Sequence, residues 1–238
     1  QSIYNPGVLA KRRAFSYKSS YMNYVLQNLI NKRKNDESIL KNEEELKDQT
    51  FEEFILQKIH DYLGMSEEEL CTNFDIPFTK NKAQRTTIVY RILGLHSDGA
   101  AEFKKANITV RTTLINNSGK IREQIPLPPF EFSEIVQEEW ETSTLRNQLL
   151  EQKFLFIIFQ EDATGVNRIK GATFWAIPEH DLEEVVRNEW TRAVDTIKSG
   201  VTLEPCYVGN ELKFHNNLPK ISDSSIVHIR PHASESGY

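Results

Sequence analysis

Apolar residues recur at helical spacing through the first half of the chain, and this pattern predicts a run of helices. Ser66 and Glu69 are spaced as a capping box, which marks the start of one of them. The polar stretch 32–49 interrupts the run and is predicted to be an unpacked linker, either a domain boundary or a long loop. The predicted helices cover residues 14–31, 51–63, 66–74 and 80–95.

The second half of the chain predicts a mixed α/β arrangement. Residues 107–115 alternate as a strand does, with Thr109, Arg111 and Thr113 opposite the apolar positions. Residues 154–159 are continuously apolar, which is typical of a strand buried on both faces. Further strands are predicted over 170–177, 201–208, 211–214 and 225–229, and helices over 134–140, 145–152 and 179–198, with Gly200 ending the last helix.

Length and composition bound the domain organisation. The chain has 238 residues, of which 39% are hydrophobic, and no apolar run approaches a membrane span. The pattern divides it into a basic arm, helix and linker over 1–49 and a main domain over 50–238. It begins at Gln1 without a signal peptide, so we expect a fragment of a longer cytoplasmic protein. Cys71 and Cys206 lack CxxC spacing and are predicted to be buried free thiols.

Charge is segregated along the chain although the net charge is only −5. Residues 1–35 and 76–97 contain basic residues and no acid. The acidic net charge argues mildly against a nucleic-acid binder, but the segregation permits a basic surface on an acidic body. The alternative is that these runs are solvated faces without a partner, which is the commoner role of charge runs.

The strand at 107–115 has the outline of a nuclease active site without its chemistry. Nucleases of the PD-(D/E)XK type place an acid before a strand that carries Glu-x-Lys, because two carboxylates hold a divalent ion near the scissile phosphate. Glu102 occupies the first position, and Thr109-x-Arg111 stands where Glu-x-Lys would be. Threonine offers no carboxylate, so the sequence predicts a nuclease-fold domain that binds DNA without cutting it. Glu102 is either a remnant of the site or a surface acid.

Several stretches of the chain resemble the MutH family, which includes mismatch-repair endonucleases and the Sau-type restriction endonucleases. They are AKRRAFSYKSSYM (10–22), QEEWETSTLRNQLLEQKFLF (137–156), PEHDLEEVVRNEWTRAVDTIKSG (178–200) and IVHIRPHAS (226–234). The resemblance is strongest to the C-terminal half of the Sau-type enzymes. It implies a MutH-like restriction-endonuclease fold, of PD-(D/E)XK type with a degraded active site, in which a mixed sheet flanked by helices forms a clamp around duplex DNA. It makes 50–238 a MutH-like DNA-binding domain.

The resemblance also places the lost catalytic groups. The family pattern of Asp, six residues and Glu-x-Lys falls on Glu102, Thr109 and Arg111. A further family acid falls near Tyr90, and a family lysine falls near Leu149 or Leu150. Sau-type enzymes carry two MutH-like halves, and the non-catalytic half binds a second copy of the recognition site. The chain resembles that half, which implies no cofactor for this domain and Mg²⁺ for the full-length enzyme.

The DNA-reading positions of the family are better kept. A strand ending in Arg-Pro feeds a loop that enters the major groove, where arginine can donate two hydrogen bonds to guanine. A family lysine before the active-site strand corresponds to Lys82, although Ala83 replaces the glycine expected after it. Arg230 could instead form a strand-end salt bridge, and Lys11, Arg12 and Arg13 could grip the backbone or belong to a solvated linker. The predicted DNA-binding residues are Arg230, Pro231, His232, Lys82, Lys80, Arg85, Lys11, Arg12 and Arg13.

Other candidate sites receive simpler interpretations. Trp140, Trp175 and Trp190 lie in apolar or amphipathic stretches and are predicted to belong to the core. His228 and His232 lack a third ligand, so no metal site is predicted there. The helices within 66–95 permit a helix-turn-helix, for which the signal is weak.

The resemblance to Sau-type enzymes, which cut at GATC, together with Thr109 and Arg111, therefore implies a catalytically silent domain that binds GATC in double-stranded DNA. It would act as the allosteric effector of a type II restriction endonuclease, with an upstream catalytic domain of the same protein and a DNA-induced dimer as partners, and no membrane. One alternative is an active Mg²⁺-dependent GATC endonuclease whose ligands are displaced to Glu102, Glu131 or Glu139. The other is a protein-interaction module derived from the nuclease fold.

Overall fold

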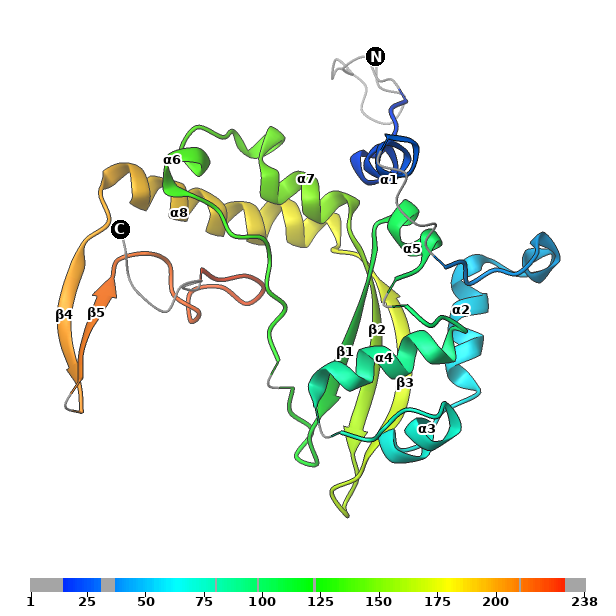
Figure 1. Cartoon of the computed structure of the whole chain (residues 1–238). Helices are drawn as coiled ribbons and strands as arrows, with labels where there is room; N and C mark the ends of the chain where they lie inside the picture. Colours follow the sequence, from blue (N-terminus) through cyan, green and yellow to red (C-terminus); the bar gives the residue numbers. More distant parts are fainter. Residues whose placement is uncertain are drawn as a thin grey trace.

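The chain folds into two lobes, which are joined at one side in the ribbon view of Figure 1. The structure, a computed structural model, describes residues 15–30, 37–79, 81–97, 99–121, 123–209 and 211–229. The first lobe holds a three-stranded sheet with helices against it, and the second holds helices and a two-stranded ribbon. This architecture confirms the predicted mixed α/β fold. No helix within the described ranges is long and apolar enough to cross a membrane.

The sheet of the first lobe is mixed, with its longest apolar strand in the centre. β1 (Ile108–Ile115) runs parallel to β2 (Lys153–Glu161), and Val110 lies opposite Leu155. β3 (Asn167–Trp175) is antiparallel to β2 on the other side. Phe154, Leu155, Ile157 and Phe159 of β2 are buried, as expected for the central strand. The strands predicted at 107–115, 154–159 and 170–177 are thus confirmed, the last starting three residues earlier than expected.

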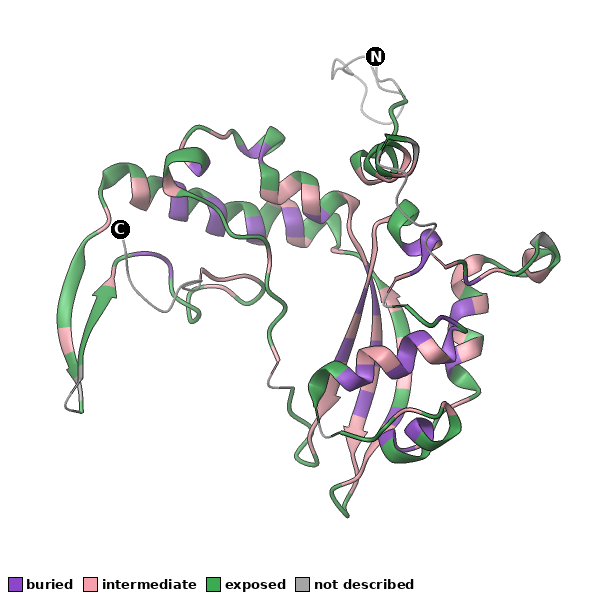
Figure 2. Cartoon of the chain, viewed as in Figure 1, coloured by how far each residue is buried: buried purple, intermediate pink, exposed green. Residues whose placement is uncertain are grey.

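One face of the sheet is covered by helices, and the main hydrophobic core lies between these helices and the sheet. α2 (Phe51–His60) and α3 (Glu67–Asn73) pack near β3, and α4 (Lys82–Ile92) packs against β1. The capping box predicted at Ser66 and Glu69 is confirmed. The buried positions of the three helices and the inward positions of the strands form one continuous cluster, seen in purple in Figure 2. Its fully buried members include Ile55, Leu70, Ile88, Leu155, Ile157 and Phe159.

The described part of the polar stretch 32–49 is packed on the first lobe, contrary to the predicted linker. Ile39 is 1% exposed and belongs to the main core. Glu37 pairs with Ala100 as an isolated bridge, and its carboxylate accepts hydrogen bonds from the backbone amides of His96 and Ser97. A short 3₁₀ helix, η1 (Glu43–Leu46), follows. The buried side chain of Ile39 and the hydrogen-bonded carboxylate of Glu37 hold this segment against the first lobe. The high average polarity of the stretch gives no indication of these two contacts. The division of domains at residue 49 stays a prediction.

The second lobe has its own core around two tryptophans. α6 (Phe132–Ile135), η2 (Trp140–Thr142) and α7 (Thr144–Glu151) pack against η3 (Asp181–Val186), a π-helical segment that continues into α8 (Arg187–Ser199). The rings of Trp140 and Trp190 lie 5.6 Å apart, and Glu183 accepts hydrogen bonds from Trp140 Nε1 and Arg146 Nε. The helix predicted over 179–198 is therefore confirmed, and Gly200 ends it at a φ of 103°.

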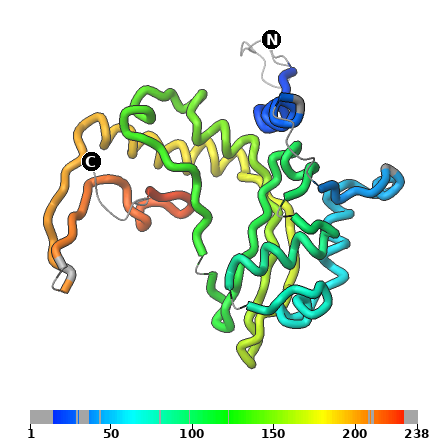
Figure 3. The backbone as a smooth tube through the Cα atoms, in the orientation of Figure 1, coloured from blue at the N-terminus to red at the C-terminus, as the bar shows by residue number. Residues whose placement is uncertain are grey.

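The backbone passes between the lobes more than once, as the tube in Figure 3 shows. β1 leads out of the first lobe to α6 and α7, and α7 returns directly into β2. After β3 the chain enters the second lobe again through η3 and α8, and then forms the ribbon of β4 (Leu203–Val208) and β5 (Glu211–Asn216). The neighbouring strands β1 and β2 are therefore joined through the second lobe, whereas β2 and β3 are joined by a short turn.

The remaining differences from the predicted elements are local. α1 (Ser19–Ile30) begins at Ser19, and residues 15–18 are not helical. α5 (Ala101–Ala106) was not predicted. Residues 225–229 form no strand, because they cross the second lobe as an irregular segment whose Val227 packs on its core. Trp175 is 40% exposed and stacks beside Phe154, so its prediction as a core residue is wrong. Cys71 is buried and Cys206 half-buried, and both are free.

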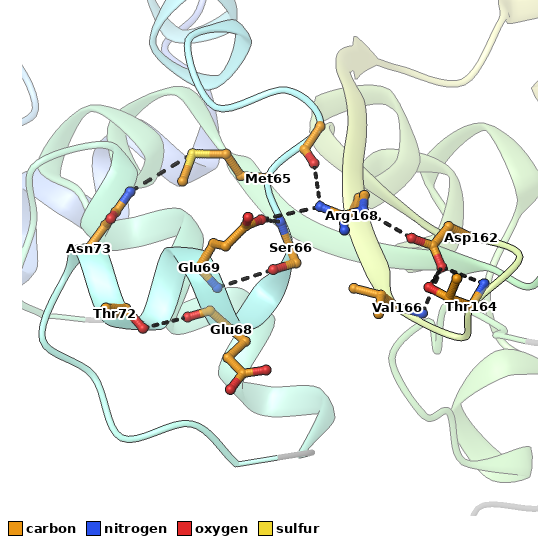
Figure 4. Close-up of polar contacts among 11 residues, drawn as sticks. Met65, Ser66, Glu68, Glu69, Thr72, Asn73, Asp162, Thr164, Val166 and Arg168 are labelled. Carbon is orange, nitrogen blue, oxygen red and sulfur yellow. Dashed lines mark hydrogen bonds and ion pairs between the residues drawn. The ribbon is translucent and has the colours of Figure 1, made fainter.

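The turn between β2 and β3 is tied to α3 by a polar network (Figure 4). Thr164, the backbone amide of Val166 and the guanidinium of Arg168 donate hydrogen bonds to Asp162, and they hold the pKa of its carboxyl well below the ordinary value. Arg168 also pairs with Glu69 at 3.2 Å, the residue that completes the capping box of α3. This network fixes the end of the sheet against the helical layer.

Candidate functional site

The second face of the sheet, opposite the main core, carries the residues that the sequence singled out. Strand alternation places Thr109, Arg111 and Thr113 on this face. Parallel pairing with β2 sets Phe154, Phe156 and Ile158 beside them, in that order. On β3, Thr173 and Trp175 lie opposite Phe156 and Phe154. We call these eight residues the second face of the sheet.

Thr109 is held by a neutral hydrogen bond. Gln152, the residue that ends α7, donates from Nε2 to Thr109 Oγ1 at 2.7 Å. Gln148 donates in turn to Gln152 Oε1 at 3.3 Å. An amide and a hydroxyl can exchange hydrogen bonds with each other, but neither brings negative charge. The position where a nuclease would hold a carboxylate therefore carries a satisfied neutral pair.

Arg111 lies in the middle of β1 with no side-chain partner. Its Nε is buried and donates to no acceptor, and the described residues include no carboxylate that pairs with the guanidinium. The guanidinium remains charged at every physiological pH. A fixed positive charge thus stands on the second face of the sheet, where the bound metal would supply positive charge in a nuclease.

The carboxylate of Glu102 is hydrogen-bonded to residues of the first lobe. From α5, its carboxylate accepts hydrogen bonds from Ser38 Oγ at 2.5 Å and from the backbone amides of Ile39 and Leu40, both at 3.2 Å. Burial alone would raise the pKa of Glu102, but the hydrogen bonds from Ser38 and the two amides outweigh it and lower the pKa. Glu102 is therefore a structural anchor for residues 38–40, and its oxygens are already in use.

These residues do not fit a divalent cation. Mg²⁺ requires oxygen ligands with negative charge, which Thr109 does not offer, and Arg111 would repel the ion. The acids considered as displaced ligands do not gather either, since Glu131 and Glu139 are exposed residues beside α6 and η2 in the second lobe. Within the described ranges, no group of three or more His, Cys, Asp or Glu side chains is arranged to hold a metal.

A polar groove lies next to Thr109, where α1 packs against α5. Its volume is about 340 Å³, and Asn23 and Gln27 of α1 line it together with Lys104 and Thr109. Amides, a hydroxyl and an ammonium group are hydrogen-bond partners suited to a phosphate or a sugar. The groove therefore extends the second face of the sheet toward the first helix.

Comparison with known proteins identifies relatives by sequence. The family model described as DNA mismatch repair enzyme MutH matches residues 93–189, which include β1, β2, β3 and the helices between them. The type II restriction enzyme Sau3AI of Staphylococcus aureus is 33% identical over 97% of the chain. Over residues 93–189 the chain matches the MutH family. The resemblance that the motifs indicated, to the family and to its Sau-type restriction enzymes, is confirmed.

The matches also differ in extent. The chain spans 50% of the length of the Staphylococcus aureus enzyme. The DNA mismatch repair protein MutH of Vibrio parahaemolyticus is 22% identical over 61% of the chain, and the match covers 67% of that protein. The chain therefore shares the MutH-like nuclease fold and corresponds in length to half of its restriction-enzyme relative.

The other positions assigned to MutH-family catalytic groups also lack charge. Tyr90, near which a family acid falls, is buried within the main core on α4. Leu149, near which a family lysine falls, is buried in the core of the second lobe, and Leu150 is half-exposed. These residues support the fold and offer neither a metal ligand nor a cation for catalysis.

The structure separates the predicted DNA contacts into three groups. Lys82 is largely exposed at the start of α4 and pairs with Glu123 at 3.1 Å, so it stays a candidate. Arg85 is buried against Glu67 at 2.5 Å and lies over Phe159, which argues against a phosphate contact, and its role stays a prediction. No side chain of α4 from Gln84 to Ile92 is exposed, which argues against a helix-turn-helix recognition role for it. The remaining candidates lie outside the described residues: Lys11, Arg12, Arg13, Lys80, Arg230, Pro231 and His232.

Two functional neighbours escaped the sequence reasoning. Gln152 holds Thr109, and Glu123 holds Lys82 while accepting a hydrogen bond from the backbone amide of Leu114. For Gln152 a signal exists, because it directly precedes the strand predicted to pair in the sheet. For Glu123 none exists, since it lies in an irregular segment far from Lys82 in sequence.

The buried pair of Glu67 and Arg85 generates a stability prediction. Glu67→Gln leaves the Arg85 charge buried without its partner, so we expect the free energy of unfolding to fall by about 3 kcal/mol in urea titration. Glu68→Gln is the matched control, because Glu68 is exposed one position further along α3 and should change stability by less than about 0.5 kcal/mol. Equal effects of the two variants would show that the pair is not structural.

The anchor at Glu102 generates a pH-dependent prediction. Because the pKa of Glu102 is lowered on folding, its stabilisation is present above the ordinary value of 4.5 and is lost as the pH falls through the folded-state value. Glu102→Gln should lower the free energy of unfolding by about 1–2 kcal/mol at neutral pH. The difference from the wild type should vanish in acid, where the wild-type carboxyl is protonated.

Urea unfolding at several pH values measures this difference. Glu134→Gln serves as a control, because Glu134 is exposed on α6 in the second lobe. A deficit for Glu102→Gln that stays constant with pH would contradict the anchoring role.

Proposed function

We propose that this chain is a double-stranded DNA-binding domain that recognises GATC and does not cut it. In this proposal it serves as the allosteric effector of a type II restriction endonuclease, with the catalytic half supplied by an upstream segment of the same protein. The similarity to a type II restriction enzyme supports a DNA-related role, and the match to half of that enzyme fits one of two halves. The observation that carries the proposal is the neutral and cationic pair of Thr109 and Arg111 on β1.

The electrostatics of the second face of the sheet support binding without cleavage. Metal-dependent hydrolysis needs a carboxylate cage that concentrates Mg²⁺ beside the scissile phosphate. Here Thr109 is neutral, Arg111 is positive and Glu102 is bonded to residues 38–40. The same face attracts the phosphate backbone, since it carries positive charge and no acid. In this proposal Mg²⁺ belongs to the catalytic half of the whole enzyme.

The two-lobed fold offers a route from DNA binding to regulation. α7 is followed by Gln152, which donates a hydrogen bond to Thr109 of β1, and the next residue begins β2. A duplex that contacts both lobes would favour one relative arrangement of them, provided that it binds that arrangement more tightly. A partner half bound to either lobe would then respond to the duplex. The proposal includes pairing of two sites, through DNA looping or a DNA-induced dimer.

Binding by the chain itself is the first test. A labelled duplex containing GATC and a scrambled duplex are titrated at two salt concentrations, and Mg²⁺ is then added. We expect preference for GATC, weaker binding at higher salt because counterions are released on binding, and no nicked product. Nicking by this chain would contradict catalytic silence and favour displaced metal ligands. Absence of salt-dependent binding to either duplex would reject the DNA-binding role and favour a protein-interaction module.

The base-reading role of Arg230 is tested by substitution. Arg230→Ala should remove the preference for GATC, at a cost of about 1–3 kcal/mol for that duplex, while affinity for the scrambled duplex changes little. Arg187→Ala is the control, because Arg187 is an exposed arginine of α8 that pairs with Glu141 and has no proposed base contact. If Arg230→Ala weakens both duplexes equally, Arg230 contacts phosphate or stabilises the loop and does not read the base.

A further inference from the structure

We propose that Arg111 binds a DNA backbone phosphate on the second face of the sheet, where its guanidinium takes the place of a catalytic metal ion. The inference rests on the proposed DNA-binding function and adds the contact by which the altered active-site face takes part in it. The ligand class is a phosphodiester of double-stranded DNA. The chemistry is a charge-assisted hydrogen bond to phosphate oxygens, with no covalent step.

Arg111 differs from every other arginine that the structure describes. Five of the others form ion pairs with carboxylates, and Arg91 donates to the backbone carbonyl of Leu95. Arg111 alone among them has no side-chain hydrogen bond or ion pair, and its Nε is buried. A buried donor on a charged group costs free energy unless an acceptor reaches it. The arrangement therefore fits a side chain whose acceptor arrives with a ligand.

The surroundings of Arg111 select an anion. The other members of the second face are threonines, aromatic residues and an isoleucine, and none of them carries negative charge. Phe156 lies beside Arg111 across the strand pair and lowers the local polarity. An oxyanion brought to this face would meet a cation with little competition from water or from protein acids. No carboxylate on this face would repel the oxyanion. In a nuclease, by contrast, the metal-binding carboxylates repel phosphate until the metal ion is bound.

The exchange of a metal for an arginine also explains binding without cleavage. A guanidinium can hold phosphate oxygens in a planar fork and neutralise their charge. It cannot lower the pKa of a bound water to generate a nucleophile, which is the part of the chemistry that a divalent ion supplies. Thr109, bonded to Gln152, offers no general base beside it. The duplex can thus be held at the former reaction site while its phosphodiester stays intact.

The test compares the salt dependence of DNA binding in two variants with the same change of charge. Arg111→Met keeps the length of the side chain and removes the cation. We expect affinity for both duplexes to fall about tenfold or more, and the slope of log affinity against log salt to decrease in magnitude by about one. Lys58→Met is the control, because Lys58 is a half-buried residue of α2 whose ammonium lies over Phe54, in the helical layer on the other side of the sheet. It should leave the slope unchanged.

Thermal unfolding of the free chain separates a binding role from a structural one. Removing a partly buried, unpaired charge should leave the melting temperature of Arg111→Met equal to or above that of the wild type. Arg111→Lys, which retains the charge but not the fork, should recover part of the affinity. A melting temperature well below that of the wild type would mean that Arg111 supports the fold, and would overturn the inference.

Neutral phosphate linkages locate the contact. Duplexes with one methylphosphonate each are scanned along the site, and the wild type should lose affinity at one linkage at which Arg111→Met loses none. If the wild type binds DNA with the expected salt dependence but Arg111→Met has the same slope and the same methylphosphonate profile, the inference fails and the proposed function stands. If the wild type itself shows no salt-dependent binding, both fail.

Discussion

The whole arrangement depends on β1, a strand that must satisfy two opposite environments. Val110 and Thr112 face the helical layer and are buried, whereas Thr109 and Arg111 face away from it. Because successive side chains alternate, a slip of one residue against β2 would drive Arg111 into the apolar core. Eight consecutive pairs with β2 hold the register against this. Packing in the first lobe therefore also determines which residues stand on the second face of the sheet.

That constraint makes the chemistry of the second face easy to change without changing the fold. Replacing a carboxylate by a threonine there alters charge but leaves the buried positions of β1 untouched, and Gln152 satisfies the hydroxyl. Placing an arginine two residues on reverses the sign of the charge that the sheet offers to a ligand. The unpaired guanidinium of Arg111 lowers the stability of the free protein. Groups that are arranged to bind a ligand commonly reduce the stability of the ligand-free fold in this way.

Sequence reasoning succeeded where periodicity decided the structure and failed where distant partners did. The strands β1 and β2, the capping box at Ser66 and the end of α8 at Gly200 follow from local patterns. The burial of Arg85 depends on Glu67, eighteen positions earlier, which no charge pattern connects to it. The packing of Ile39 and the exposure of Trp175 likewise depend on the tertiary fold. Thr109 and Arg111 indicate the candidate site from the sequence, whereas the hydrogen bond that joins Gln152 to Thr109 is seen only in the folded arrangement.

Glu102 has a structural role at the position where the family pattern has a catalytic acid. Its carboxylate binds the backbone amides of residues 39 and 40, which follow the segment after α1. α5, which carries Glu102, also forms one wall of the groove beside Thr109, with α1 as the other. The carboxylate already accepts three hydrogen bonds at its roughly four lone-pair sites, which leaves little capacity for a metal ion. Anchoring residues 38–40 and holding a metal ion are thus alternative uses of this carboxylate, and the fold of this chain employs the first.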